Sequence, residues 1–150
     1  MVGLHEVGVI HRDIKPQNIL IKEGQCMLAD FGVSKLVTKP EDWMLTQTEG
    51  TFHFMPPEAC DPDIDQIEGR KADVWALGVT LFCLSFNAVP FDGANEFWVM
   101  ESIRKNPLTL PETRQISDEL RALIKFVLDK DPKMRPTAAQ ILEHPFLSEH

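Results

Sequence analysis

The chain has 150 residues, 43% of them hydrophobic, and a formal net charge of −8. This length and composition allow one core of ordinary domain size, so we expect one domain or part of one. The acidic balance excludes nucleic acid and anionic membranes as favoured partners, because neither attracts a negatively charged protein. Residues 41–69 hold eight acidic residues and no Lys or Arg, which is typical of a solvated loop; a surface for basic substrates is the alternative.

Cysteine usage and hydropathy indicate the compartment. Cys26, Cys60 and Cys83 are odd in number and lack the close spacing of a metal site, so we expect a reducing compartment, the cytoplasm, with the nucleus as an open alternative. The N-terminus lacks the basic flank and apolar stretch of a signal peptide. The longest apolar run, residues 74–86, is shorter than the roughly 20 residues that a membrane span needs.

The first predicted element is a short helix over residues 1–8, with Gly8 as its C-cap. Such a helix is not stable alone, since even about 12 to 15 residues are marginal in water. We therefore expect these residues to be the last turns of a longer helix.

Residues 11–18, His-Arg-Asp-Ile-Lys-Pro-Gln-Asn, gather an acid, a cation and an amide. Asp13 is suited to accept a proton from a hydroxyl nucleophile, and Lys15 to neutralise charge on a transferring phosphoryl group. Asn18 offers an amide oxygen to a hard cation such as Mg²⁺. The pattern predicts a phosphoryl-transfer loop.

Two short strands, 18–21 and 26–29, are predicted around a turn at residues 22–25. This hairpin would return Asp30-Phe31-Gly32 to the loop and supply a second metal-binding carboxylate. Residues 33–58 show no clean period and contain several prolines, which predicts an irregular loop of about 25 residues, long enough to be functional.

Helices are predicted for most of the remainder. The run over residues 71–81 is apolar on all faces and should lie buried in a mainly helical body. Residues 95–105 and 117–128 have the spacing of amphipathic helices. A last short helix, residues 137–143, is expected to stop at Pro145. The three tryptophans are predicted to pack rather than to recognise a partner; they are Trp43, Trp75 and Trp98.

In their order along the chain, several motifs resemble those of the protein kinases, and Lys15 followed by Pro16 resembles the serine/threonine class. The motifs are His11-Arg12-Asp13, Asn18, Asp30-Phe31-Gly32, Gly50-Thr51, Pro57-Glu58, Asp73 with Gly78, and Arg135. Pro56 stands where the family usually has Ala before Pro-Glu. The resemblance covers essentially the whole chain, but it extends only over the C-terminal lobe of the kinase domain.

The resemblance implies a mainly α fold over residues 1–150. The C-terminal lobe of a kinase is a helical bundle with a short β-hairpin that carries the catalytic and magnesium loops. The sequence contains no G-x-G-x-x-G loop after a strand and no V-A-I-K lysine, so we expect the N-terminal lobe to be missing.

The resemblance also implies the site. Asp13 and Lys15 would be catalytic, Asn18 and Asp30 would hold Mg²⁺ on ATP, and Leu20 would contact the adenine. Structural support and activation-segment residues would complete the site; they are His11, Arg12, Phe31, Gly32, Glu58, Asp73 and Arg135 for support, and Thr46, Thr48 and Thr51 in the activation segment.

Two of the supporting roles are specific. The resemblance pairs Arg135 with Glu58, and it has Asp73 hold the backbone of the catalytic loop from beneath. For Asp73 the alternative is an N-terminal helix cap, which complements the helix dipole.

Residues 29–34, 50–55 and 73–81 are most similar to the calcium/calmodulin-dependent protein kinase kinase branch. Many serine/threonine kinases carry an activating phosphothreonine four residues before the position of Thr51, where this chain has Gln47. We therefore hypothesise activity without a phosphate at that position, with Thr46 or Thr48 as alternative acceptors.

The implied function is transfer of the ATP γ-phosphoryl group to Ser or Thr hydroxyls of a protein, and another kinase is one candidate substrate. Without the N-terminal lobe the chain is expected to be inactive. The alternative is a non-catalytic interaction module, a pseudokinase-like scaffold. Calmodulin would bind only through segments outside residues 1–150.

Overall fold

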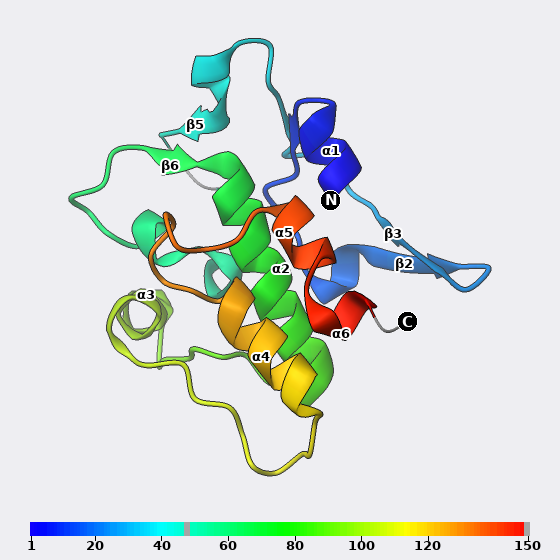
Figure 1. Cartoon of the computed structure of the whole chain (residues 1–150). Coiled ribbons are helices and arrows are strands. Elements are labelled where there is room, and N and C mark those ends of the chain that lie inside the picture. The colour runs from blue at the N-terminus through cyan, green and yellow to red at the C-terminus, as the bar shows by residue number, and fades with distance from the viewer. Residues whose placement is uncertain (47–48, 149–150) are drawn as a thin grey trace.

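The computed structural model describes residues 1–46 and 49–148. The long helix α2, Gly69–Phe86, runs through the middle of the molecule (Figure 1). Its N-cap is Glu68, whose side chain accepts hydrogen bonds from the backbone N–H groups of Arg70 and Lys71. Its C-cap is Asn87, which has the left-handed conformation (φ 54°) that ends many helices. The predicted helix at 71–81 is therefore extended at both ends.

Other helices pack around α2. Helix α4, Asp118–Val127, lies alongside it, and α3, Glu96–Lys105, lies on the other side of the molecule from α5 (Figure 1). Both begin at capping side chains close to the predicted starts, because Asn95 and Ser117 accept hydrogen bonds from backbone N–H groups of the first turn.

The C-terminal helices differ in part from the prediction. Helix α5, Ala138–Leu142, ends before Pro145 as expected, but Pro145 also begins a further helix, α6, Pro145–Ser148. Proline is well tolerated at the first helical position, because no intrahelical bond uses its nitrogen there. Pro145 thus starts a new helix three residues after α5 ends at Leu142.

Three two-stranded antiparallel sheets connect the remaining segments. The predicted hairpin is present as β2, Ile19–Lys22, paired with β3, Gln25–Leu28, and it projects away from the helices (Figure 1). Strand β1, Val9–Ile10, pairs with β4, Lys35–Leu36, and β5, Met44–Leu45, pairs with β6, Ile67–Glu68. Helix α1 comprises Val2–Glu6.

The irregular loop predicted over residues 33–58 contains short regular pieces that were not predicted. Strands β4 and β5 lie within it, together with three 3₁₀ turns at Pro40–Trp43, Phe52–Phe54 and Pro57–Ala59. Each piece spans two to four residues, too short to leave a periodic pattern in the sequence. The segment is held in place by pairing with strands outside it.

The core surrounds α2. Trp75, Val79 and Phe82 pack with buried residues of α3 and α4, and Val74 packs with α4 and α5. A third cluster, Ile10, Leu45 and Ile67, joins the small sheets to the start of α2. The packing prediction holds for Trp75, which is fully buried, but it was wrong for Trp98, which is 55% exposed.

Candidate functional site

The buried carboxylate of Asp73, on α2, binds the backbone of the loop at residues 11–18. Its Oδ2 accepts a hydrogen bond from the backbone N of His11, and its Oδ1 accepts one from the backbone N of Arg12, each at 2.9 Å. Arg12 has φ 67°, a left-handed conformation that is uncommon for a non-glycine residue. The capping alternative for Asp73 was wrong, because Glu68 caps α2.

Asp13 lies at the centre of a set of polar contacts. Its Oδ2 is 2.9 Å from Nζ of Lys15 and accepts a hydrogen bond of 2.9 Å from Nδ2 of Asn18. The same Nδ2 donates to the backbone O of Asp13 at 2.8 Å. The turn Pro16–Asn18, a short 3₁₀ helix, brings the amide back over the aspartate. The loop thus holds an acid, a cation and an amide in direct contact.

The segment over residues 33–58, which the resemblance implies is the activation segment, approaches this loop at Gly50 and Thr51. Nζ of Lys15 donates to Oγ1 of Thr51 at 3.2 Å. Gly50 has φ 99°, and a Cβ placed on it would lie 2.9 Å from the backbone O of Arg12. Glycine is therefore required at position 50 for two reasons. The backbone has a positive φ, and a side chain would clash with the backbone O of Arg12.

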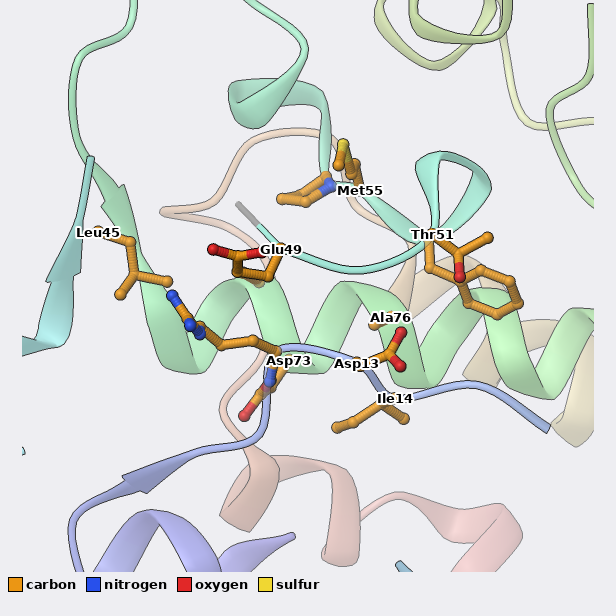
Figure 2. Close-up of a pocket in the computed structure, with 12 residues that line it drawn as sticks. Asp13, Ile14, Leu45, Glu49, Thr51, Met55, Asp73 and Ala76 are labelled. Atoms are coloured by element: carbon orange, nitrogen blue, oxygen red, sulfur yellow. The ribbon is translucent and has the colours of Figure 1, made fainter. Parts of the chain in front are cut away.

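A small cavity lies between these segments. The segment with Glu49, Thr51 and Met55 lies across from the segment with Asp13, and α2 runs alongside both (Figure 2). The cavity volume is about 30 Å³, enough for roughly one water molecule. It is too small to hold a nucleotide.

The hairpin positions Asp30 relative to the loop. The backbone N of Ala29 donates to the backbone O of Asn18 at 2.9 Å, which ties the end of β3 to the start of β2. Nε2 of His11 lies 3.0 Å from the backbone O of Ala29, and its ring is 5.0 Å from that of Phe31. Asp30 itself is exposed, has φ 60°, and accepts a hydrogen bond from the backbone N of Gly32.

Asn18 and Asp30 offer oxygen atoms of the kind that bind a magnesium ion together with phosphate groups. Both hydrogens of the Asn18 amide point to Asp13, which leaves Oδ1 of Asn18 as an acceptor. Asp30 supplies a carboxylate, and Mg²⁺ is typically bound by one or two such oxygens plus substrate phosphates and water. Within residues 1–46 and 49–148 no group of three or more His, Cys, Asp or Glu is placed to hold a metal.

Glu58 and Arg135 form a buried bidentate ion pair. Nη1 and Nη2 of Arg135 lie 2.7 and 2.9 Å from the two carboxylate oxygens of Glu58. The guanidinium also donates to the backbone O atoms of Lys71 and Asp129, and it lies 4.9 Å from the centroid of the Trp75 ring. The pair joins the end of the activation segment to the start of α2 and to the loop before α5.

Two of the remaining expected residues lie at the surface. Leu20 is 53% exposed on the hairpin. Thr46 is exposed and lines a hollow with Arg12, Lys35 and Glu49. Thr48 lies outside the described residues, as does Gln47.

One residue of the site was not found from the sequence. His5, in α1, places Nε2 at 2.9 Å from Oδ2 of Asp73. The contact joins residues 68 positions apart, and a single histidine in a short helix has no pattern that would reveal it.

The fold is that of a protein kinase. The family model described as "Protein kinase domain" matches residues 1–147, so the chain belongs to the protein kinase family, and its relatives are serine/threonine kinases. The kinase fold and the class of transferase follow from this membership.

Individual relatives give the extent of the similarity. The serine/threonine-protein kinase ssp1 of Schizosaccharomyces pombe is 41% identical over 95% of this chain and 23% of its own length. The serine/threonine-protein kinase GRIK1 of Arabidopsis thaliana is 40% identical over 99% of the chain and 36% of its own length. The calcium/calmodulin-dependent protein kinase kinase cmkC of Emericella nidulans is 34% identical over 98% of the chain and 28% of its own length.

The chain thus spans well under half the length of these curated relatives. Among the helices that the structure describes, none is long and apolar enough to cross a membrane.

Proposed function

We propose that these residues form the C-terminal lobe of a serine/threonine kinase domain that transfers the γ-phosphoryl group of ATP to protein hydroxyls. The observation that carries the proposal is the contact set of Asp13, whose Oδ2 lies 2.9 Å from both Nζ of Lys15 and Nδ2 of Asn18. A carboxylate held beside a cation and an amide is the arrangement that positions a hydroxyl nucleophile and stabilises developing phosphoryl charge.

Each residue has a defined task in this proposal. Asp13 orients the substrate hydroxyl and accepts its proton, while Lys15 stabilises negative charge on the transferring group. Bound Mg²⁺ would supply neutralisation of the phosphate charge, and Asn18 and Asp30 would hold it. Thr51 accepts a hydrogen bond from Lys15 and belongs to the surface that binds the protein substrate. Leu20, on the hairpin, would contact the adenine.

The finer assignment is to the calcium/calmodulin-dependent protein kinase kinase branch, with another kinase as substrate and the cytoplasm as the place of action. The similarity of residues 29–34, 50–55 and 73–81 supports the branch, as does the similarity of the chain to cmkC. Activity without activation-segment phosphate belongs to the same proposal. Mass spectrometry of active protein that shows obligatory phosphate on Thr46 or Thr48 would contradict it.

The test of the main proposal is magnesium-dependent phosphorylation of Ser/Thr peptides by the full-length protein. Asp13→Asn should lower kcat by about 10²- to 10⁴-fold, the usual contribution of a positioned general base. Asp30→Asn should raise the magnesium concentration needed for half-maximal rate. The control is Asp63→Asn, an exposed carboxylate distant in sequence from the loop, and it should leave both parameters unchanged. Phosphate transfer that survives Asp13→Asn would contradict the proposal.

A second candidate function is a non-catalytic interaction module. The observation that favours it is an exposed aromatic pair at the start of α3, where Phe97 is 62% and Trp98 is 55% exposed with ring centroids 5.3 Å apart. Such pairs are enriched in protein interfaces. Partner binding that is unaffected by ATP, together with the absence of phosphate transfer, would support this function over the enzyme.

A further inference from the structure

Trp43 is a half-buried aromatic side chain to which none of the roles above assigns a function. Its ring lies against the guanidinium of Arg70, whose Cζ is 4.4 Å from the ring centroid. The ring of His5 meets it edge-on, with centroids 6.3 Å apart and planes at 82°. Because Arg70 belongs to α2, the contact joins the segment over residues 33–58 to the central helix.

A closed turn precedes Trp43 and fixes the direction of its side chain. Oδ2 of Asp42 accepts hydrogen bonds from the backbone N and Oγ1 of Thr38, at 3.0 and 2.8 Å, and from the backbone N of Lys39 at 3.2 Å. These bonds close the 3₁₀ turn Pro40–Trp43 at its start. The aromatic ring is therefore presented to α2 by local structure.

Arg70 lies where the helix itself does not favour a cation. It is in the first turn of α2, at the positive end of the helix dipole. Its Nε is 2.7 Å from Oε1 of Glu68, and its side chain is 48% exposed. A guanidinium over the face of a tryptophan ring is attracted by the electrons of the ring. Glu68 and Trp43 together offset the unfavourable position of Arg70.

The two residues after Trp43 attach the same segment to the core. Strand β5 pairs with β6, which leads directly into α2. Leu45, in β5, is 5% exposed and packs with Ile10 and Ile67, and Trp43 lies against this cluster. Trp43 and Leu45 therefore anchor the segment at one place, by a cation–aromatic contact and by apolar burial.

The anchored residues lie close in sequence to the contact with Lys15. Only four residues separate Leu45 from Gly50, and Leu45 and Thr51 line the same small cavity (Figure 2). Since each residue spans at most about 3.6 Å, fixing Leu45 restricts where Gly50 and Thr51 can lie. Release of the anchor would give this part of the chain many more conformations, in which Thr51 leaves Nζ of Lys15.

We propose that Trp43 is a positioning residue for the protein substrate. By packing on Arg70, it holds the segment over residues 33–58 on α2 and keeps Gly50 and Thr51 beside Lys15 without the help of a phosphate. The inference rests on the function proposed above, and it names the contact that orders the substrate-binding surface.

The test compares two variants of the full-length protein, after phosphatase treatment, with a Ser/Thr peptide as substrate. Trp43→Phe keeps a ring for the cation, whereas Trp43→Leu keeps an apolar side chain without one. Trp43→Phe should keep the KM for peptide within about twofold of the wild type, and Trp43→Leu should raise it on the order of tenfold. The peptide binds the ordered state, so a lower population of that state raises KM while kcat and the KM for ATP stay nearly unchanged.

The control is Leu36→Thr, which changes an exposed side chain of β4 in the same segment and should leave the KM for peptide unchanged. Equal KM values for Trp43→Phe and Trp43→Leu would overturn the proposal. A fall in kcat with an unchanged KM for peptide would indicate a merely structural role and would overturn it as well.

Arg70→Met tests the contact from the side of α2 and serves also if Trp43→Leu does not fold. Methionine keeps an apolar stem without the charge, so the KM for peptide should rise as it does in Trp43→Leu. The double variant should show no further rise, because both changes remove the same contact. Full additivity of the two effects would mean that the residues act separately and would overturn the proposal.

Amide hydrogen exchange reads the order of the segment without an activity assay. The backbone N atoms of Phe54 and Met55 donate to the backbone O atoms of Thr51 and Phe52. Their exchange should be faster in Trp43→Leu than in Trp43→Phe, with equal exchange in the middle of α2. Faster exchange throughout α2 would indicate a general loss of stability and would overturn the positioning role.

The untreated wild type separates this inference from the proposed function. An untreated wild type that transfers no phosphate would overturn both together. A wild type that is active before phosphatase treatment and inactive after it would overturn this inference alone, because a phosphate would then order the segment.

Discussion

Glu58 and Arg135 show at the scale of single residues how a buried charge depends on its partner. Arg135 is 1% exposed, and the two carboxylate oxygens of Glu58 satisfy both terminal nitrogens of its guanidinium. Removing one partner of such a pair leaves an uncompensated charge in the interior. Losing one partner would therefore destabilise the protein more than the intact pair stabilises it.

We predict that Glu58→Gln lowers the free energy of unfolding by about 3–5 kcal/mol, measured by urea denaturation with tryptophan fluorescence. The control is Lys105→Met, which removes an exposed pairing with Glu101 on α3 and should leave the denaturation midpoint nearly unchanged. Equal midpoints for the two variants would show that Arg135 finds other partners.

Burial also determines the chemistry of the thiols. Burial raises the pKa of the Cys60 thiol to about 12 from its ordinary value of 9.0, and burial also raises the pKa of Cys83. Cys26 is exposed on β3. We expect a thiol reagent to modify Cys26 quickly in the folded protein, the partly exposed Cys83 more slowly, and the buried Cys60 only after unfolding.

The raised pKa of Cys60 predicts a loss of stability at alkaline pH. Above about pH 9 the unfolded chain releases a proton that the folded chain keeps until about pH 12, so the free energy of unfolding falls as the pH rises through this window. Urea denaturation at about pH 8 and about pH 10 should show a decrease that is smaller in Cys60→Ala, by up to about 1 kcal/mol. An identical decrease in both proteins would contradict the prediction.

At the scale of elements, the contact between α2 and α4 depends on Gly78. A Cβ on this residue would lie 2.8 Å from both Cγ1 of Val127 and Cδ2 of Leu128, closer than real contacts allow. Gly in a helix interior normally weakens the helix relative to Ala. Here the absence of a side chain lets the two helices approach, so packing outweighs helix propensity.

Gly78→Ala should therefore destabilise the protein by about 1–3 kcal/mol despite the better helix propensity of alanine. The control is Gly3→Ala in α1, where a Cβ would meet no atom within 4 Å, and it should not destabilise. Thermal unfolding of both variants checks the prediction, and a stabilised Gly78→Ala would show that α4 moves away at little cost.

The elements also show which kinds of structure can be read from a sequence. Helices α3 and α4 begin within a residue or two of the predicted starts, because capping side chains and apolar spacing mark them locally. Strands β4 and β5 were missed, because each has two residues and is defined by a partner elsewhere in the chain. A two-residue strand has no period to detect.

At the scale of the whole molecule, the hairpin exposes an apolar surface. Leu20 is 53% exposed and its cross-strand partner Met27 is 42% exposed, on one face of an element that projects from the helical body (Figure 1). Exposed apolar groups that lie close together mark surfaces that associate with other protein. In the kinase proposed above, this surface would face the nucleotide and the rest of the domain.

We predict that the 150-residue chain, produced alone, binds a hydrophobic dye at this hairpin. Leu20→Thr should reduce dye fluorescence without lowering the unfolding temperature, because threonine suits a strand and the replaced side chain is exposed. The control is Ile64→Thr, in the loop before β6, where the exposed isoleucine is 41% accessible. Equal fluorescence changes in the two variants would show that the dye binds elsewhere.

The loop residues, the main helices and the hairpin could be predicted from the amino-acid sequence alone. Asp13, Lys15 and Asn18 lie within six residues, so a single tight turn suffices to bring them into contact, and the family motifs follow them in order. The central helix was recognisable because an apolar run of that length has few other structures open to it.

The residues that hold that loop from distant parts of the sequence could be identified only in the tertiary structure. The contacts of Asp73 with His11 and with His5 span 62 and 68 residues, and the Glu58–Arg135 pair spans 77. Such contacts form where packing around α2 brings segments together, and they leave no local period or propensity in the chain. The resemblance to kinases indicated two of them, whereas His5 emerged only when helix α1 was placed against α2, because a buried carboxylate requires donors wherever the fold can provide them.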